Sequence, residues 1–261
     1  MAVVLGTYAL LIECWRRVLA ELGGTLSFPR AAVIWLGSNL ARYLPLSGWQ
    51  FALMTMMAKR RNVPVAVSAG ASVLLAVVNV ITGLVVFGLA SAAAPSVATS
   101  TLWLVALAVV LVLVAPLALP HLGRILRALS GREITLPTFT FRAVAIAAAG
   151  TSVAWLAYGG AFWLLARGVL PTASPPALAP SIAVYTGAYL AGLLAIVPPA
   201  GLGAAEYAMI QLAGGLALFG PAEIAWLAIV VRLWRTVLEI VPGVIVLGAT
   251  TLLDRREMER T

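Results

Sequence analysis

Charged residues are scarce in this sequence. Asp, Glu, Lys and Arg together make up 10% of the 261 residues, whereas 62% are hydrophobic. An ordinary water-soluble domain carries about 25% charged residues, so too few are present here to cover a surface that faces water. The composition excludes a soluble fold. It predicts an all-α polytopic membrane protein, because the apolar runs suffice for roughly five to seven helical crossings.

Cysteine and histidine occur once each, as Cys14 and His121. A disulfide framework or a metal site built on these residue types needs several of them. The sequence also contains neither a D-x-D nor an H-E-x-x-H pattern. We therefore expect no metal, no cofactor and no catalytic residues, and hence a protein that is not an enzyme. One enzymatic alternative stays open, in which a glutamate or an arginine acts on a lipid phosphate.

Basic residues outnumber acidic ones 17 to 9, which gives a formal net charge of +8. They occur in short clusters between apolar runs. All but four fall on one side when the runs are taken as crossings, the exceptions being Arg42, Arg167, Arg232 and Arg235. This positive-inside pattern predicts a multi-pass protein of the cell inner (cytoplasmic) membrane with a cytoplasmic C-terminus. It argues against a nucleic-acid partner.

The apolar runs form a single membrane domain over residues 1–261, in which one arrangement occurs twice. Residues 1–92 and residues 142–253 each contain a span, a broken hairpin and a long span, and residues 101–120 form a connecting span between them. The basic clusters place the first hairpin on the cytoplasmic side and the second on the outer side. The sequence therefore predicts an inverted repeat joined by a connecting helix.

Each hairpin is interrupted by a P-x-x-G sequence, which runs from Pro45 to Gly48 in the first and from Pro198 to Gly201 in the second. Residues 49–58, the second arm of the first hairpin, supply only about 15 Å of helix, too little to cross the bilayer. We therefore favour re-entrant hairpins over pairs of ordinary spans joined by a Pro-Gly turn. Interrupted segments at corresponding positions of two inverted halves are typical of a transporter's substrate site.

Ionisable side chains inside apolar runs mark candidate site residues, because each costs about 2.5–3.5 kcal/mol at a helix centre. Arg42 and Glu206 lie beside the breaks, and Arg232, Arg235 and Glu239 share one face of the last span at i, i+3 and i+7. With the positive ends of the half-helices, the arginines can hold a lipid phosphate. Structural alternatives stay open. Glu206 can cap its own helix or pair with an arginine, and the three charged residues of the last span can serve only to pack that span against the other helices.

The candidate substrate-binding residues therefore lie at the two breaks and on the last span. They are Arg42, Tyr43, Pro45, Gly48, Trp49, Gln50, Pro199, Gly201, Gly203, Glu206, Arg232, Arg235 and Glu239.

Two motifs carry a resemblance to a known family. Residues 39–50 are similar to a Y-L-P-G-x-x-W pattern, with Leu46 in place of a glycine, and residues 199–206 are similar to P-G-G-L-G-x-x-E, with Ala200 in place of a glycine. In this order, and followed by Arg232, they resemble the membrane, flippase-like domain of lysylphosphatidylglycerol synthases and its stand-alone relatives. The resemblance covers most of the chain.

This resemblance implies the movement of a lipid between leaflets. In the synthases the lipid is aminoacylated phosphatidylglycerol, and in stand-alone members we expect other lipids or polyprenyl-linked sugars. Many members carry one more span ahead of the segment that ends in Trp15, so this chain is expected to start late or to be naturally shorter. The sequence contains no soluble aminoacyl-transferase domain, so we expect no synthase activity from it.

These features together predict a flippase-like transporter that moves an anionic phospholipid or a polyprenyl-linked lipid between leaflets. The alternative is a non-transporting membrane scaffold that binds lipid or a partner enzyme. Membrane lipids are the expected partners, and a lipid-modifying enzyme is a further one that the scaffold would hold. The sequence does not predict the head group, the energy source or the oligomeric state.

Overall fold

A computed structural model describes residues 1–44, 49–92, 139–170, 176–195, 199–216 and 218–258 of the chain, and the elements in this part are all helices. In chain order they are α1 (Ala2–Glu21), α2 (Phe28–Asn39), the 3-10 turn η1 (Leu40–Tyr43), α3 (Trp49–Lys59), α4 (Val65–Ser91), α6 (Phe141–Val169), α7 (Leu178–Leu194), the 3-10 turn η2 (Pro199–Gly201), α8 (Ala204–Gly215) and α9 (Pro221–Met258). The predicted connecting span at 101–120 lies outside the described residues.

The helix boundaries agree with the apolar runs to within a few residues, and the exceptions have local causes. Helix α7 begins at Leu178, because Pro180 falls in its first turn, where a missing N–H donor costs nothing. Helix α8 ends at Gly215, because Gly214 and Gly215 favour termination over continued helix. Helix α9 continues past the predicted end at residue 253 to Met258.

Helices α4 and α6, of 27 and 29 residues, are long and apolar enough to cross a bilayer, with mean hydropathies of 2.6 and 1.4 over an 18-residue stretch of each. Their outward faces remain apolar. Val73 on α4 is 50% exposed and Leu156 on α6 is 51% exposed, and Leu233 on α9 is exposed as well. Apolar side chains in rows along long helices need a lipid-like environment rather than water. The architecture is therefore that of an α-helical membrane protein.

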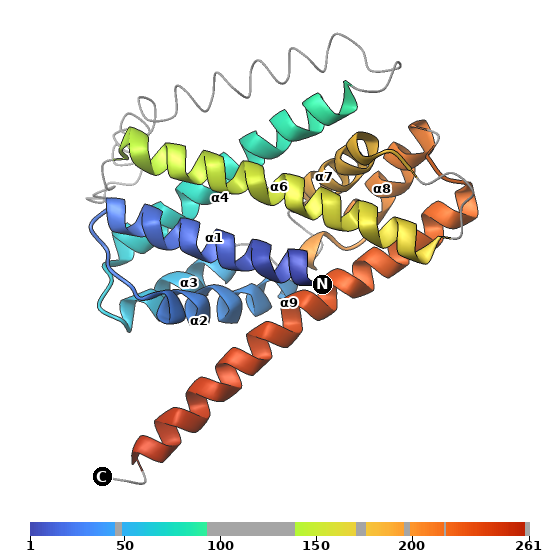
Figure 1. Ribbon diagram of the computed structural model, residues 1–261. Coiled ribbons are helices and arrows are strands. Elements are labelled where there is room, and N and C mark those ends of the chain that lie inside the picture. The colour runs from blue at the N-terminus through green and yellow to red at the C-terminus, as the bar shows by residue number, and fades with distance from the viewer. Residues whose placement is uncertain (45–48, 93–138, 171–175, 196–198, 217, 259–261) are drawn as a thin grey trace.

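Helices α1, α4, α6 and α7 pack on one another and form the body of the molecule, with α1 beside α6 and α4 against both α6 and α7 (Figure 1). Small residues allow these close crossings. A Cβ added at Gly159 of α6 would lie 2.8 Å from the Cα of Ile182 on α7, and one added at Gly150 would lie 2.6 Å from Sγ of Cys14 on α1. Larger side chains at these glycines would force the helices apart.

The helix contacts within the first half recur in the second. The pairs α1–α2, α2–α3 and α3–α4 correspond to α6–α7, α7–α8 and α8–α9. The contacts between the halves show the same correspondence. Helix α2 of the first half packs on α9 of the second, α7 of the second half packs on α4 of the first, and η1 contacts η2. The two helix breaks therefore lie next to each other, although more than 150 residues separate them in the chain.

Candidate substrate site

The second break is a turn of left-handed backbone. Ala200, Gly201 and Gly203 have φ values of 49°, 68° and 83°. A Cβ at Gly201 would clash with the backbone carbonyl of Gly192, so only glycine fits there. Ala200 adopts a conformation that glycine favours, which gives a physical reason why glycine is usual at this position in the family that the motif resembles. Three such residues within four positions form the turn that leads directly into α8.

Glu206 and Arg232 hold this turn in place. The backbone N–H of Gly203 donates to Glu206 Oε2 at 2.7 Å, which is the glutamate half of a capping box at the start of α8. Arg232 Nη1 on α9 donates to the carbonyl oxygen of Ala200 at 3.1 Å and lies 3.6 Å from Glu206 Oε1. The structure thus contains both interactions that the structural alternative for Glu206 requires. A role of Glu206 in transport stays a prediction.

The first break meets the middle of α9 through Glu239. The hydroxyl of Tyr43 donates to Glu239 Oε2 at 2.8 Å, and Arg42 Nη1 lies 3.6 Å from Glu239 Oε1. Arg235, one turn earlier on α9, approaches the same oxygen at 3.7 Å, as its i, i+4 spacing predicts. The side chains of Arg42, Arg235 and Glu239 are only 19%, 15% and 6% exposed. Two arginines therefore share one buried carboxylate.

Tyr189 of α7 stacks against both arginines. Arg42 Nη2 donates to its hydroxyl at 2.9 Å, and the guanidinium of Arg235 lies 4.5 Å from the centre of its ring. Even so, the buried Nε of Arg235 has no hydrogen-bond partner in the part of the chain that the structure describes. A buried donor without a partner is costly, so this end of the site is suited to accept an anion.

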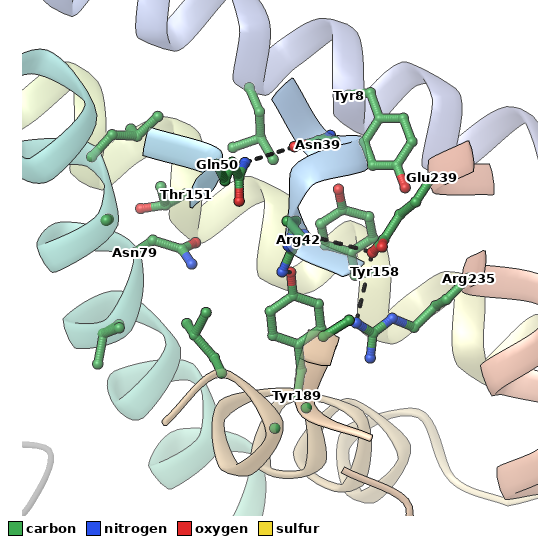
Figure 2. Close-up of a pocket in the computed structure, with 18 of the residues that line it drawn as sticks. Tyr8, Asn39, Arg42, Gln50, Asn79, Thr151, Tyr158, Tyr189, Arg235 and Glu239 are labelled. Atoms are coloured by element: carbon green, nitrogen blue, oxygen red, sulfur yellow. Dashed lines mark hydrogen bonds and ion pairs between the residues drawn. The ribbon is translucent and has the colours of Figure 1, made fainter. Parts of the chain in front are cut away.

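A cavity of about 350 Å³ lies beside this cluster. Its wall comes from both halves of the chain: α1, α2, η1, α3 and α4 of the first, and α6, α7, η2 and α9 of the second. Figure 2 shows Arg42, Tyr189, Arg235 and Glu239 grouped at one side of the space, with Asn79, Thr151 and Gln50 at the other. Much of the remaining wall is apolar, and includes Val4, Leu11, Leu75, Val80, Leu193 and Leu238.

Residues 1–243 match the family described as the transmembrane region of lysylphosphatidylglycerol synthase. The chain belongs to this family. The family predicted from the two motifs is thereby confirmed. The match to a transmembrane region also agrees with the long apolar helices, and both assign the protein to the membrane. Comparison of the chain with curated proteins, and with solved structures, found no match.

The structure brings together many of the predicted site residues. Five of them line the cavity: Arg42, Gln50, Gly201, Arg235 and Glu239. Tyr43 is not part of the wall, but its hydroxyl donates a hydrogen bond to Glu239. Glu206 and Arg232 lie just behind, around a small space of about 10 Å³ that Arg235 also borders. Pro199 begins η2 and Gly203 is the N-cap of α8. Pro45 and Gly48 lie outside the described residues.

Trp49 does not take the predicted position at the cavity. Its side chain is 52% exposed and contributes nothing to the wall. Gln50 and Met54, one turn apart on α3, face the cavity instead. Because successive residues of a helix are rotated by about 100°, Trp49 points away from the face that Gln50 and Met54 share.

Several site residues were missed at the sequence level. Four tyrosines form a connected aromatic group that lines the cavity: Tyr8, Tyr158, Tyr185 and Tyr189. Asn39 and Asn79 also lie in its wall. A signal for Asn79 was present, because it is a lone amide in the middle of the 27-residue apolar helix α4. The tyrosines come from three helices and no single segment indicates that they meet.

Proposed function

We propose that this protein moves an anionic lipid between the leaflets of the cell inner membrane and that the cavity binds the head group. The observation that carries the proposal is the formal charge of the buried cluster. Arg42 and Arg235 contribute two positive charges, whereas Glu239 is the one carboxylate among the described residues of the cavity wall. An uncompensated charge in a low-dielectric site is expensive, and an anionic head group would neutralise it.

The dimensions and chemistry of the cavity support an amphiphilic ligand. A volume of about 350 Å³ lies at the lower end of the range of small-molecule sites, which suits a head group rather than a whole lipid. Apolar side chains from α1, α4, α7 and α9 adjoin the charged cluster, so the first carbons of acyl chains would meet an apolar wall. An ion with no apolar part would leave that wall unused.

The arrangement of the two breaks supports transport rather than simple binding. Their contact, and the exchange of helix pairs between the halves, fit an inverted repeat with re-entrant hairpins, residues 1–92 opposite residues 142–253. In transporters built this way, the substrate site lies near the midplane, between broken helices. Rocking of one half against the other would expose the cavity to each leaflet in turn.

The positions of charged helix ends support a cytoplasmic C-terminus. Arg142 at the start of α6 lies 3.3 Å from Glu21 at the end of α1, so these two ends are on the same side of the molecule. Figure 1 shows the C-terminal end of α9, which carries Arg255 and Arg256, toward that side. Under the positive-inside rule this side faces the cytoplasm.

A proteoliposome assay tests the proposal. The purified chain is reconstituted with fluorescently labelled phosphatidylglycerol, and a membrane-impermeant quencher measures how much label reaches the outer leaflet. We expect movement by the wild type and its loss in Arg42→Gln and Arg235→Gln. Arg167→Gln is the matched control, because Arg167 lies over the Trp163 ring at an exposed end of α6, away from the cavity.

Three results of this assay would be informative. Movement that depends on Arg42 and Arg235 but not on Arg167 would establish translocation through the cavity. Binding of labelled lipid without movement would favour the scaffold, which holds lipid or a partner enzyme without transport. Chemical conversion of the lipid by the purified chain would contradict the proposal that this membrane region does no chemistry itself.

A further inference from the structure

The cavity is too small to enclose a whole lipid. Its volume of about 350 Å³ equals that of a sphere about 9 Å across, whereas acyl chains extend over about 15 Å, half the thickness of the hydrocarbon core. Acyl chains are also less stable in polar surroundings than among apolar groups. The chains of a lipid whose head group lies in the cavity must therefore pass through an opening in its wall.

Two apolar side chains of the wall are also exposed on the outside of the molecule. Phe51, near the start of α3, is 37% exposed, and Leu194, at the end of α7, is 60% exposed. Every other described residue of the wall is buried or half-buried. A side chain that belongs to both surfaces marks a place where the cavity opens.

The start of α3 lies against the middle of α4. A short turn joins these two helices, which pack on each other and run antiparallel. Ser72 Oγ of α4 donates to Met54 Sδ of α3 at 3.4 Å, and this contact sets their register. Phe51 precedes Met54 by about one turn and Ala76 follows Ser72 by about one turn, so the two are level with each other at the edge of the cavity.

The end of α7 approaches the same part of α4, because both contact Trp155 of α6. Trp155 Nε1 donates to the Asn79 carbonyl oxygen at 2.9 Å, and the ring centre of Trp155 lies 5.3 Å from that of Tyr189 on α7. Leu194 follows Tyr189 by little more than one turn. The described residues show no extended packing of α3 on α7, so an opening over α4 separates the two helices. The residues that define it are apolar: Phe51, Ala76, Val80, Leu193 and Leu194.

The wall is closed on the side of α9. Val4 of α1 and Leu238 of α9 pack together with Ala161 of α6, and Val4 and Leu238 are only 3% and 5% exposed. Asn39 of α2 and Glu239 of α9, two helices that pack on each other, are 4% and 5% exposed. A chain that leaves the cavity therefore meets less obstruction between α3 and α7 than beside α9.

We infer that the opening between α3 and α7 binds the acyl chains of the lipid whose head group lies in the cavity. The chains pass over the apolar surface of α4 and stay in the hydrocarbon core while the head group meets Arg42 and Arg235. This inference rests on the proposed function, but it assigns a separate site. The ligand of that site is hydrocarbon, and none of the residues that define it belongs to the charged cluster.

Photocrosslinking in proteoliposomes tests the inference. The probe is phosphatidylglycerol with a diazirine near the carboxyl end of one acyl chain, and mass spectrometry locates the adducts after irradiation. We expect adducts at Phe51, Val80 and Leu194 in the wild type and their loss in Arg42→Gln and Arg235→Gln, because the chain is held there by its head group. Adducts at Leu156 of α6 should persist in all three proteins, since Leu156 is 51% exposed and lies outside the wall.

A bulky side chain at the base of the opening provides an independent test. Ala76→Trp should abolish the movement of labelled lipid and the adducts at Leu194, because the indole would fill the path of the chains. Val77→Trp is the matched control, since Val77 is the next residue of α4, is 40% exposed and is no part of the wall. The wild-type adducts and their dependence on the arginines stand without these variants, so poor folding of Ala76→Trp does not remove the test.

Failure of the inference and failure of the proposed function give different results. Movement that depends on Arg42 and Arg235, with arginine-dependent adducts beside α9 at Val4 and Trp234 instead, would overturn the inference and leave the transporter. Equal movement by Ala76→Trp and Val77→Trp would also overturn it, as would adducts at Phe51 and Leu194 that persist without the arginines. Arginine-dependent adducts at the opening without any movement would support the acyl-chain site and contradict transport.

Discussion

Removal of the negative charge of Glu239 tests the central cluster most directly. In Glu239→Gln, the side chain can still accept the hydrogen bond from Tyr43, but Arg42 and Arg235 lose their shared counterion. The formal charge of these three residues rises from +1 to +2. Removal of one partner from a buried ion pair typically costs 3–5 kcal/mol, because a buried charge remains uncompensated. We expect a destabilisation of about 3 kcal/mol, since the hydrogen bond to Tyr43 is retained.

Thermal unfolding in detergent, followed by tryptophan fluorescence, measures this effect. Glu21→Gln is the matched control, because Glu21 pairs with Arg142, whose side chain is 78% exposed, and such surface pairs contribute at most about 1 kcal/mol. An anionic lipid that occupies the site supplies the missing counterion. Added phosphatidylglycerol should therefore stabilise Glu239→Gln more than it stabilises the wild type or Glu21→Gln.

Two results would refute this reasoning. If Glu239→Gln unfolds at the same temperature as Glu21→Gln, the two arginines do not depend on Glu239 for charge compensation. If phosphatidylglycerol raises the unfolding temperature of all three proteins equally, the lipid binds elsewhere. A double variant, Arg42→Gln with Glu239→Gln, should recover part of the lost stability, because it restores the charge of +1.

Other predictions concern the second break and the packing of α9, and thermal unfolding measures each of them. Gly201→Ala should destabilise by more than 2 kcal/mol because its Cβ would meet a backbone carbonyl, whereas Gly203→Ala, with open space and a positive φ, should cost only about 1–2 kcal/mol. Glu206→Gln should cost less than Glu206→Ala, because a glutamine side chain can still accept the hydrogen bond from the Gly203 N–H, and Glu206→Ala should cost about 1 kcal/mol. Gly243→Ala should destabilise because its Cβ would lie 2.8 Å from the carbonyl oxygen of Leu36. Equal effects of Gly201→Ala and Gly203→Ala would contradict the close approach at the second break.

Helix positions could be predicted well because each depends on local signals. Apolar runs long enough to cross a bilayer, bounded by proline or basic residues, define α4 and α6. The i, i+4 spacing of Arg235 and Glu239 predicted their pairing, which the structure contains. The alternative that Glu206 caps α8 was also available from its position three residues after Gly203.

The composition of the cavity could not be predicted, because it depends on which helices meet. Tyr8 and Tyr158, which are 150 positions apart in the chain, contact each other only because α1 packs beside α6. Glu239 pairs with Tyr43 for the same reason, since α2 lies across α9. Trp49 was assigned to the cavity by its closeness to the break in sequence, whereas the rotation of α3 decides which of its residues face inward.

Helix α9 connects the two breaks through residues on one of its faces. Arg232 donates to the Ala200 carbonyl of the second break, and Glu239 accepts from Tyr43 of the first. Arg235 lies between them and reaches both Glu239 and Tyr189. Under the proposed function, an anionic head group bound at Arg235 would meet the part of α9 that lies between its contact with the second break, through Arg232, and its contact with the first, through Glu239. Movement of either break relative to α9 would then alter the surroundings of the same bound phosphate.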